Sequence, residues 1–336
     1  MSGLRYLSVC SGIEAASVAW HGLGWTPVGF SEIEPFPSAV LQHHYPHVPN
    51  LGDMTNFKEW NLGTVDLLVG GTPCQSFSVA GLRKGLDDPR GNLMLTFLAI
   101  AERHRPRWIV WENVPGVLSS NGGRDFGTFL GALAELGYGW AYRVLDAQWF
   151  GVAQRRRRVF VVGCLGDQAS AAAVLFESES VCRYFEKSGK ARQGAARGVT
   201  RCFAGSSESG VAATLETTSH DYSRADGFNM VAQPVVYERH DQDARVKEVS
   251  VAPTLHSKSD NTCDLPMVQA AMQVRRLTPV ECERLQGFPD GYTNIPWRKK
   301  DEAPDGPRYK ALGNSMAVPC MRWIGERINA IEEKHT

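Results

Sequence analysis

The chain has 336 residues, 43% of them hydrophobic, and its 36 basic and 36 acidic side chains give a formal net charge of zero. This length and composition are typical of a globular protein with two domains. No apolar run approaches the roughly 20 residues that span a bilayer, so we exclude a membrane span and expect a cytoplasmic location. The eight cysteines show no C-x-x-C spacing, which favours reduced thiols over a zinc site or a disulfide framework, and we predict no metal site.

Apolar segments alternate with helical patterns over the first half of the chain. Strands that alternate with helices form parallel sheets with helices on both faces. We therefore predict an α/β fold with a doubly wound, Rossmann-like parallel sheet. The predicted strands are 6–10, 26–31, 65–70, 107–112 and 159–163, and the predicted helices are 14–23, 35–44, 92–104 and 126–136.

After residue 165 the alternation ends, and serine, glycine, threonine and short β-branched runs take its place. We interpret residues 166–304 as a second, smaller domain, rich in loops and strands, together with a hinge. Residues 1–165 and 305–336 form the first domain in this division. Thr278 before Pro279 predicts the start of a helix, because threonine is a good N-cap and proline suits the first helical position.

Reactive side chains stand at the ends of the predicted strands. Cys74 follows the strand 65–70, Glu112 closes the next predicted strand, and the run Gln154–Arg158 precedes the last one. Because ligands collect outside the carboxyl ends of parallel strands, we expect the thiol and the carboxylate to face one crevice. Nearby arginines favour a thiolate, which is the nucleophilic form of cysteine. The pattern predicts a nucleophile at Cys74.

In this order the motifs resemble those of the cytosine-C5 DNA methyltransferases of bacteria and phages. The resemblance covers the chain except for about 166–274. It implies transfer of a methyl group from S-adenosylmethionine to C5 of cytosine within a specific double-stranded DNA sequence. Residues 1–165 plus 305–336 would then be the catalytic, cofactor-binding domain, and 166–304 the target-recognition domain. The matching segments are 10–14, Glu32, Asp53, 73–74, 112–114, 154–158, 276–289 and 309–319.

The resemblance also implies where S-adenosylmethionine binds. The fingerprint G-x-G-x-x-G is absent, which argues against a nicotinamide dinucleotide and fits a cofactor without phosphate. Glu32 would bind the ribose and Asp53 the adenine amino group. The family usually has an aromatic residue where Cys10 stands, glycine where Glu14 stands and tryptophan where Ile33 stands. The implied cofactor-binding residues are Cys10, Ser11, Gly12, Ile13, Glu32, Ile33, Asp53, Met54, Pro73, Asn314 and Ser315.

For catalysis, the resemblance implies that Cys74 attacks C6 of a cytosine flipped out of the duplex. Protonated Glu112 would contact N3 and the exocyclic amine, and Arg158 would donate to O2. Arg156 would shape the surroundings of the thiolate, and Asn113 would order the loop after Glu112. The residues expected to contact DNA are Gln75, Ser78, Arg83, Lys84 and Gln154.

Two other functions are alternatives. One is methylation of RNA by the same chemistry, as in the tRNA-directed branch of the family. That branch has Cys-Phe-Thr in its recognition segment, and Cys202-Phe203-Ala204 does not match it. The other is a catalytically inactive DNA-binding protein, which the combination of Cys74 with Glu112 disfavours. We expect a monomer that acts on double-stranded DNA, with a cognate restriction endonuclease as a separate protein.

Overall fold

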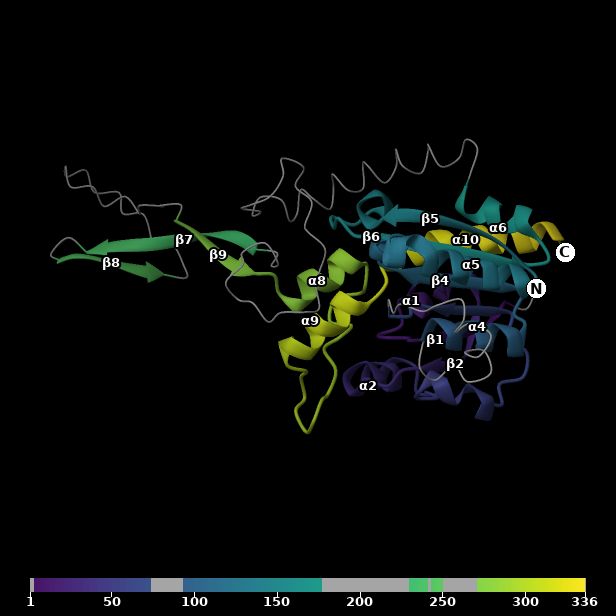
Figure 1. Ribbon diagram of the computed structural model, residues 1–336. Coiled ribbons are helices and arrows are strands. Elements are labelled where there is room, and N and C mark those ends of the chain that lie inside the picture. Colours follow the sequence, from purple (N-terminus) through teal and green to yellow (C-terminus); the bar gives the residue numbers. More distant parts are fainter. Residues whose placement is uncertain (1–2, 74–92, 177–229, 241–242, 250–270, 336) are drawn as a thin grey trace.

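The computed structural model describes residues 3–73, 93–176, 230–240, 243–249 and 271–335, and between 230 and 276 it describes the backbone alone. A six-stranded sheet in the order β2-β1-β3-β4-β6-β5 forms its centre (Figure 1). The first four strands are parallel to one another, as predicted. The strands are β1 (Arg5–Val9), β2 (Thr26–Ser31), β3 (Leu67–Gly70), β4 (Trp108–Asn113), β5 (Tyr138–Asp146) and β6 (Arg157–Leu165).

The far side of the sheet differs from the prediction. We expected a parallel strand at 159–163, but β6 is antiparallel to both β4 and β5, and β5 itself was not predicted. The link from β5 to β6 is short and contains a single 3-10 turn, Ala147–Phe150. A short link joins antiparallel neighbours, whereas a parallel pair needs a long crossover. β5 mixes buried and exposed positions, so it lacks the continuous apolar run of an inner parallel strand.

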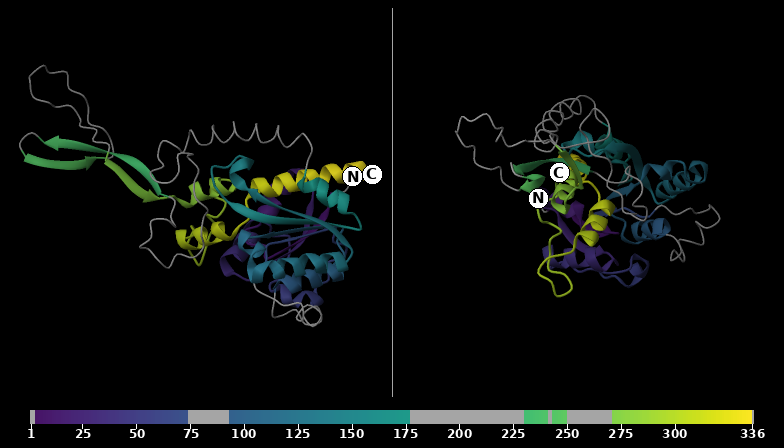
Figure 2. Two further views of the ribbon diagram at one scale, coloured as in Figure 1. Left: turned by 45° about the horizontal axis from the view of Figure 1, so that its top comes forward. Right: turned by 90° about the vertical axis from the view of Figure 1, so that its left-hand side faces the viewer.

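Helices cover both faces of the sheet, which makes it doubly wound (Figure 2). One apolar core lies under α1 (Ala15–Trp20), α6 (Gln168–Leu175) and α10 (Val318–His335). The indole of Trp20 donates to the carbonyl of Met321 at 2.8 Å and so joins α1 to α10. The other core lies under α4 (Leu93–His104) and α5 (Arg124–Glu135). Two ends of the chain thus pack on one face.

Shorter elements complete the main body. Helix α2 (Pro35–His44) follows β2, and α9 (Asp305–Asn314) precedes α10. In the described residues, no helix combines the length and the apolar character that crossing a bilayer requires. The four cysteines in these residues, Cys10, Cys164, Cys282 and Cys320, are free thiols. The remaining 3-10 segments are His21–Leu23, Met54–Glu59, Pro115–Leu118 and Ser120–Gly123.

A second, three-stranded sheet projects from the main body beside α8, the helix Pro279–Gln286 (Figure 1). It is antiparallel, in the order β8-β7-β9, and consists of β7 (Met230–His240), β8 (Asp243–Val249) and β9 (Ala271–Arg276). The predicted helix start is confirmed, since Thr278 and Glu281 form a capping box on α8 (Pro279–Gln286).

The segments on either side of this second sheet pack on the main body. Helix α6 contacts β5 and β6, and Leu277, Leu285 and Phe288 share the core that lies under α1. The division at residues 165 and 305 remains a prediction. The strand-rich region expected after residue 165 is present as the second sheet.

Candidate active site

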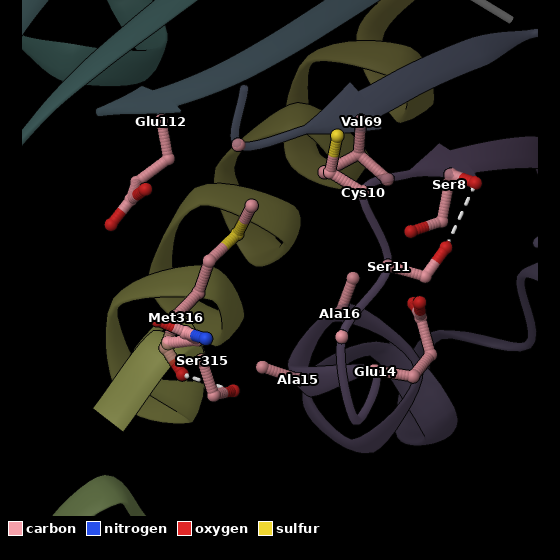
Figure 3. A pocket seen from close by; sticks show the side chains of 13 residues that line it. Ser8, Cys10, Ser11, Glu14, Ala15, Ala16, Val69, Glu112, Ser315 and Met316 are labelled. Carbon is pink, nitrogen blue, oxygen red and sulfur yellow. Dashed lines mark hydrogen bonds between the residues drawn. The ribbon is translucent and has the colours of Figure 1, made fainter. Parts of the chain in front are cut away.

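The described residues form a pocket at the carboxyl ends of β1, β3 and β4, the edge where a doubly wound sheet binds ligands. Figure 3 shows the side chains around it, which come from the β1–α1 loop, from the ends of β3 and β4, and from the link between α9 and α10. The lining residues are Ser8, Cys10, Ser11, Gly12, Glu14, Ala15, Ala16, Val69, Gly71, Glu112, Asn314, Ser315 and Met316.

The loop between β1 and α1 brings predicted cofactor residues into this pocket. The backbone φ is positive at Cys10, Gly12 and Glu14, so the chain turns sharply between strand and helix. The amide of Gly12 donates to Glu32 Oε2 at 2.8 Å, which holds the residue after β2 beside the loop. The structure therefore places Cys10, Ser11 and Gly12 in the pocket lining. Glu32 is hydrogen-bonded to this loop but does not line the described pocket.

Four other predicted cofactor residues lie around this loop. Ile13 is fully buried beneath it, and the sulfur of Met54 lies 3.5 Å from that of Cys10. Asp53 caps the short helix that follows it. Ile33 is 69% exposed, an uncommon position for a large apolar side chain. None of the four lines the described pocket, and their contacts with the cofactor remain predictions.

Glu112, predicted to be catalytic, is the next-to-last residue of β4 and lines the pocket, with Arg158 beside it. The Nε of Arg158 lies 3.1 Å from Glu112 Oε1, and Glu112 is only 8% exposed. Burial raises the pKa of Glu112, and the charges of Arg158 and then Arg156 oppose that rise. This carboxyl can therefore hold a proton more readily than an exposed glutamate, with a guanidinium in contact.

Arg156 is buried and hydrogen-bonds to the segment between α9 and α10, which lines the pocket. Its Nη2 donates to the carbonyls of Gly313 at 3.0 Å and of Ser315 at 2.7 Å. These two bonds fix the link between α9 and α10, so that Asn314 and Ser315 line the pocket as predicted for cofactor-binding residues. An influence of Arg156 on a thiolate remains a prediction.

The chain that leads to the predicted nucleophile is fastened to the end of β4. Asn113 Nδ2 donates to the carbonyl of Thr72 at 2.8 Å, and the indole of Trp111 donates to Thr72 Oγ1 at 3.0 Å. Both bonds are buried. Pro73, an exposed residue, comes next and carries the chain toward Cys74. The approach to Cys74 is thus anchored beside Glu112 by buried polar contacts.

Several predicted residues lie outside the described part of the chain: Cys74, Gln75, Ser78, Arg83 and Lys84. Gln154, the remaining residue expected to contact DNA, is described. It is completely buried, and its amide nitrogen and oxygen have no hydrogen-bond partner among the described residues. Its predicted contact with DNA remains a prediction.

The pocket also contains residues that the sequence reasoning did not select, among them Ser8, Glu14, Gly71 and Met316. Gly71 packs so closely that a Cβ there would lie 3.1 Å from Glu112 Oε2. Position in the chain could have indicated three of them, since Gly71 follows a predicted strand end and Glu14 and Met316 adjoin predicted cofactor residues, whereas Ser8 lies within the predicted strand 6–10. At Glu14 the sequence shows only a departure from the glycine that is usual in the family.

Comparisons with known proteins agree with this architecture. A family model described as C-5 cytosine-specific DNA methylase matches residues 4–330. The chain is 39% identical to a protein of Escherichia phage P1 named DNA N-6-adenine-methyltransferase, a match that covers 98% of the chain and 61% of that protein. It is 29% identical to Type II methyltransferase M2.BsuMI of Bacillus subtilis strain 168, with 97% and 75% covered. The crystal structure of the S. pombe Dnmt2 methyltransferase has a TM-score of 0.64 at 19% identity, covering 99% of each chain.

Proposed function

The chain belongs to the C-5 cytosine-specific DNA methylase family, and on this premise we propose that it transfers a methyl group from S-adenosylmethionine to C5 of cytosine in double-stranded DNA. The observation that carries the proposal is the end of β4. There the buried carboxyl of Glu112 contacts Arg158, and the neighbouring residues anchor the chain that enters Cys74. We propose that Cys74, Glu112 and Arg158 serve one pocket as nucleophile, proton-holding carboxyl and cationic donor.

The pocket suits S-adenosylmethionine. Its walls combine apolar side chains with acceptors and hydroxyls, and Glu32 stands behind the glycine turn where a ribose diol can be bound. The exposed Ile33 offers an apolar surface to a purine. When bound, S-adenosylmethionine supplies an electrophilic methyl group. We assign the cofactor contacts to Cys10, Ser11, Gly12, Ile13, Glu32, Ile33, Asp53, Met54, Pro73, Asn314 and Ser315.

The chemistry assigned to the protein is nucleophilic catalysis. The thiolate of Cys74 forms a bond to C6, and the electron pair of the C5–C6 double bond moves toward C5, which becomes the carbon nucleophile. Glu112 gives a hydrogen bond or its proton to N3 and so offsets the negative charge on the ring. Arg158 donates to O2. Once C5 carries the methyl group, with S-adenosylhomocysteine as the other product, C5 loses its proton to solvent and the thiolate of Cys74 leaves C6, which restores the double bond.

The ring must leave the base stack before Cys74 can reach C6, so we propose that the target cytosine is flipped into the pocket, at a cost of a few kcal/mol. The loop that follows Cys74 and residues 166–304 are assigned to DNA contact and target recognition. The second sheet, which projects from the main body, offers strands of the kind that can enter a groove. A monomer and a separately acting endonuclease are part of the same proposal.

The name of the phage P1 relative raises adenine N6 as another target. An exocyclic amine needs no covalent activation by a thiol, whereas C5 of cytosine does. Residues 73–74 and Glu112 therefore favour cytosine. The 39% identity extends over only 61% of the phage protein, so its name describes a protein much of which this chain does not match.

The experiment is methyl transfer from radiolabelled S-adenosylmethionine to DNA that lacks methylation, followed by nucleoside chromatography. We expect label in 5-methylcytosine, and none from a Cys74→Ser variant that melts at the temperature of the unmodified chain. Label in N6-methyladenine, or transfer by Cys74→Ser at the unmodified rate, would contradict the proposal. A parallel reaction with transfer RNA tests the RNA alternative, since transfer to RNA alone would replace DNA as the substrate.

A further inference from the structure

A second buried carboxyl lines the pocket at Glu14, between β1 and α1. Its Oε1 accepts from the amide of Ser17 at 3.1 Å and from the hydroxyl of Ser17 at 3.2 Å. The residue is 1% exposed, and no group among the described residues makes a hydrogen bond to its Oε2. Oε1 of the carboxyl thus caps helix α1, whereas Oε2 remains available to accept a hydrogen bond from a ligand.

Keeping a glutamate at this position is unfavourable for folding. Its φ is +64°, a left-handed conformation that costs a residue with a Cβ about 1–2 kcal/mol and that glycine adopts freely. The described ion pairs include none to Glu14. A strained backbone and an unsatisfied buried oxygen at the edge of a pocket are the features from which a functional role is inferred.

The groups that surround this carboxyl are uncharged. Tyr6 shares a hydrogen bond of 2.6 Å with the hydroxyl of Ser17, and Tyr292 donates to the carbonyl of Ile13 at 2.9 Å. Hydroxyls and carbonyl oxygens can accept from a cationic ligand, but they cannot neutralise Glu14. The site therefore suits a positively charged donor.

The pocket fixes which cation that is, given the proposed function on which this inference rests. S-adenosylmethionine carries two positive centres, the sulfonium and the α-ammonium of its methionine part. The sulfonium must face the cytosine, and therefore the Glu112 side. Figure 3 shows Glu112 and Glu14 on opposite sides of the pocket. We propose that the carboxylate of Glu14 binds the α-ammonium group of S-adenosylmethionine and so positions the methyl group toward Glu112.

The acidity of Glu14 agrees with this assignment. Burial raises its pKa to about 7, although the nearby hydroxyl of Ser8 and the hydrogen bonds from Ser17 oppose the rise. A carboxyl that is only partly ionised at neutral pH gains its full charge when an ammonium ion binds beside it.

The test is calorimetric binding of two probes at pH 7.5: S-adenosylhomocysteine, and its analogue with hydrogen in place of the α-amino group. Glu14→Gln keeps the size and the helix cap but removes the charge, and Glu14→Gly relieves the positive φ. Glu34→Gln is the matched control, because Glu34 is exposed and pairs with Lys310 outside the pocket. Melting temperatures establish that each variant folds.

We expect both Glu14 variants to bind S-adenosylhomocysteine about 10- to 100-fold more weakly, the range of a lost charge-assisted hydrogen bond, and to bind the desamino analogue as the unmodified chain does. Glu34→Gln should bind both probes normally. An equal loss for both probes, or no loss, overturns the inference alone and leaves the proposed function standing. Failure of the unmodified chain to bind S-adenosylhomocysteine overturns the proposed function together with the inference.

Discussion

Each of the two sides of the pocket contains a buried glutamate, but the two residues differ in backbone conformation and in charged partners. Glu112 lies in a regular strand, next to its last residue, and contacts Arg158 at 3.1 Å. Glu14 has a φ of +64° and no charged partner in the described ion pairs. Burial raises the pKa of both carboxyls. The comparison teaches that burial makes a carboxyl able to hold a proton, whereas its neighbours decide whether it is arranged to donate that proton or to bind a cation.

The largest expected effect is a loss of methyl-transfer rate when Glu112 is replaced. Glu112→Gln keeps the shape but loses the proton supplied to N3, so the rate of methyl transfer should fall about 10²- to 10⁴-fold, the contribution typical of a general acid. Single-turnover transfer to DNA measures it. Affinity for S-adenosylhomocysteine should hardly change, whereas Glu14→Gln should act chiefly through the KM for S-adenosylmethionine. If the two variants show the same division between kcat and KM, the two sides are not distinct.

The second effect is on stability. Folding raises the pKa of Glu14 from 4.5 to about 7, so the folded chain holds this proton more tightly and loses stability as the pH rises through that range. At pH 8 the free energy of unfolding of Glu14→Gln should therefore exceed that of the unmodified chain by roughly 3 kcal/mol. This difference should become smaller toward pH 5. Urea denaturation at both pH values measures it. A less stable variant at pH 8 would mean that Glu14 serves the fold.

The third effect is the pH dependence of cofactor binding. Only ionised Glu14 pairs with an ammonium, so affinity for S-adenosylhomocysteine should fall about tenfold per pH unit well below pH 7. The nearby phenols do not titrate there, because burial raises the pKa of Tyr6, of Tyr292 and, to about 12, of Tyr45. Calorimetry from pH 5.5 to 8 measures it. Glu14→Gln should flatten the profile, and an equally steep profile for that variant would assign the titration to another group.

Much of the fold could be predicted from the sequence. The alternation of strand and helix patterns identified β1 to β4, and apolar runs mark β3 and β4 most clearly, because strands buried on both faces need apolar residues. β5 was missed and the direction of β6 was wrong for one shared reason. The edge strand is only partly buried, and a short connection reverses the chain without leaving a signal in hydrophobic periodicity.

The candidate site could be predicted where residues follow strand ends, as with Cys10, Gly12 and Glu112. Glu14 could not, because its importance lies in an unsatisfied oxygen and a positive φ, and neither can be read from residue type. The anchoring of Asn314 and Ser315 by Arg156 likewise depends on packing between distant segments.

The most direct test of the two-sided pocket is a crystal structure of the chain with S-adenosylhomocysteine at pH 7.5. We predict the α-ammonium within hydrogen-bond distance of Glu14 Oε2 and the sulfur directed toward Glu112. An amino group bound elsewhere, with Glu14 Oε2 still without a partner, would contradict the assignment of the two carboxyls.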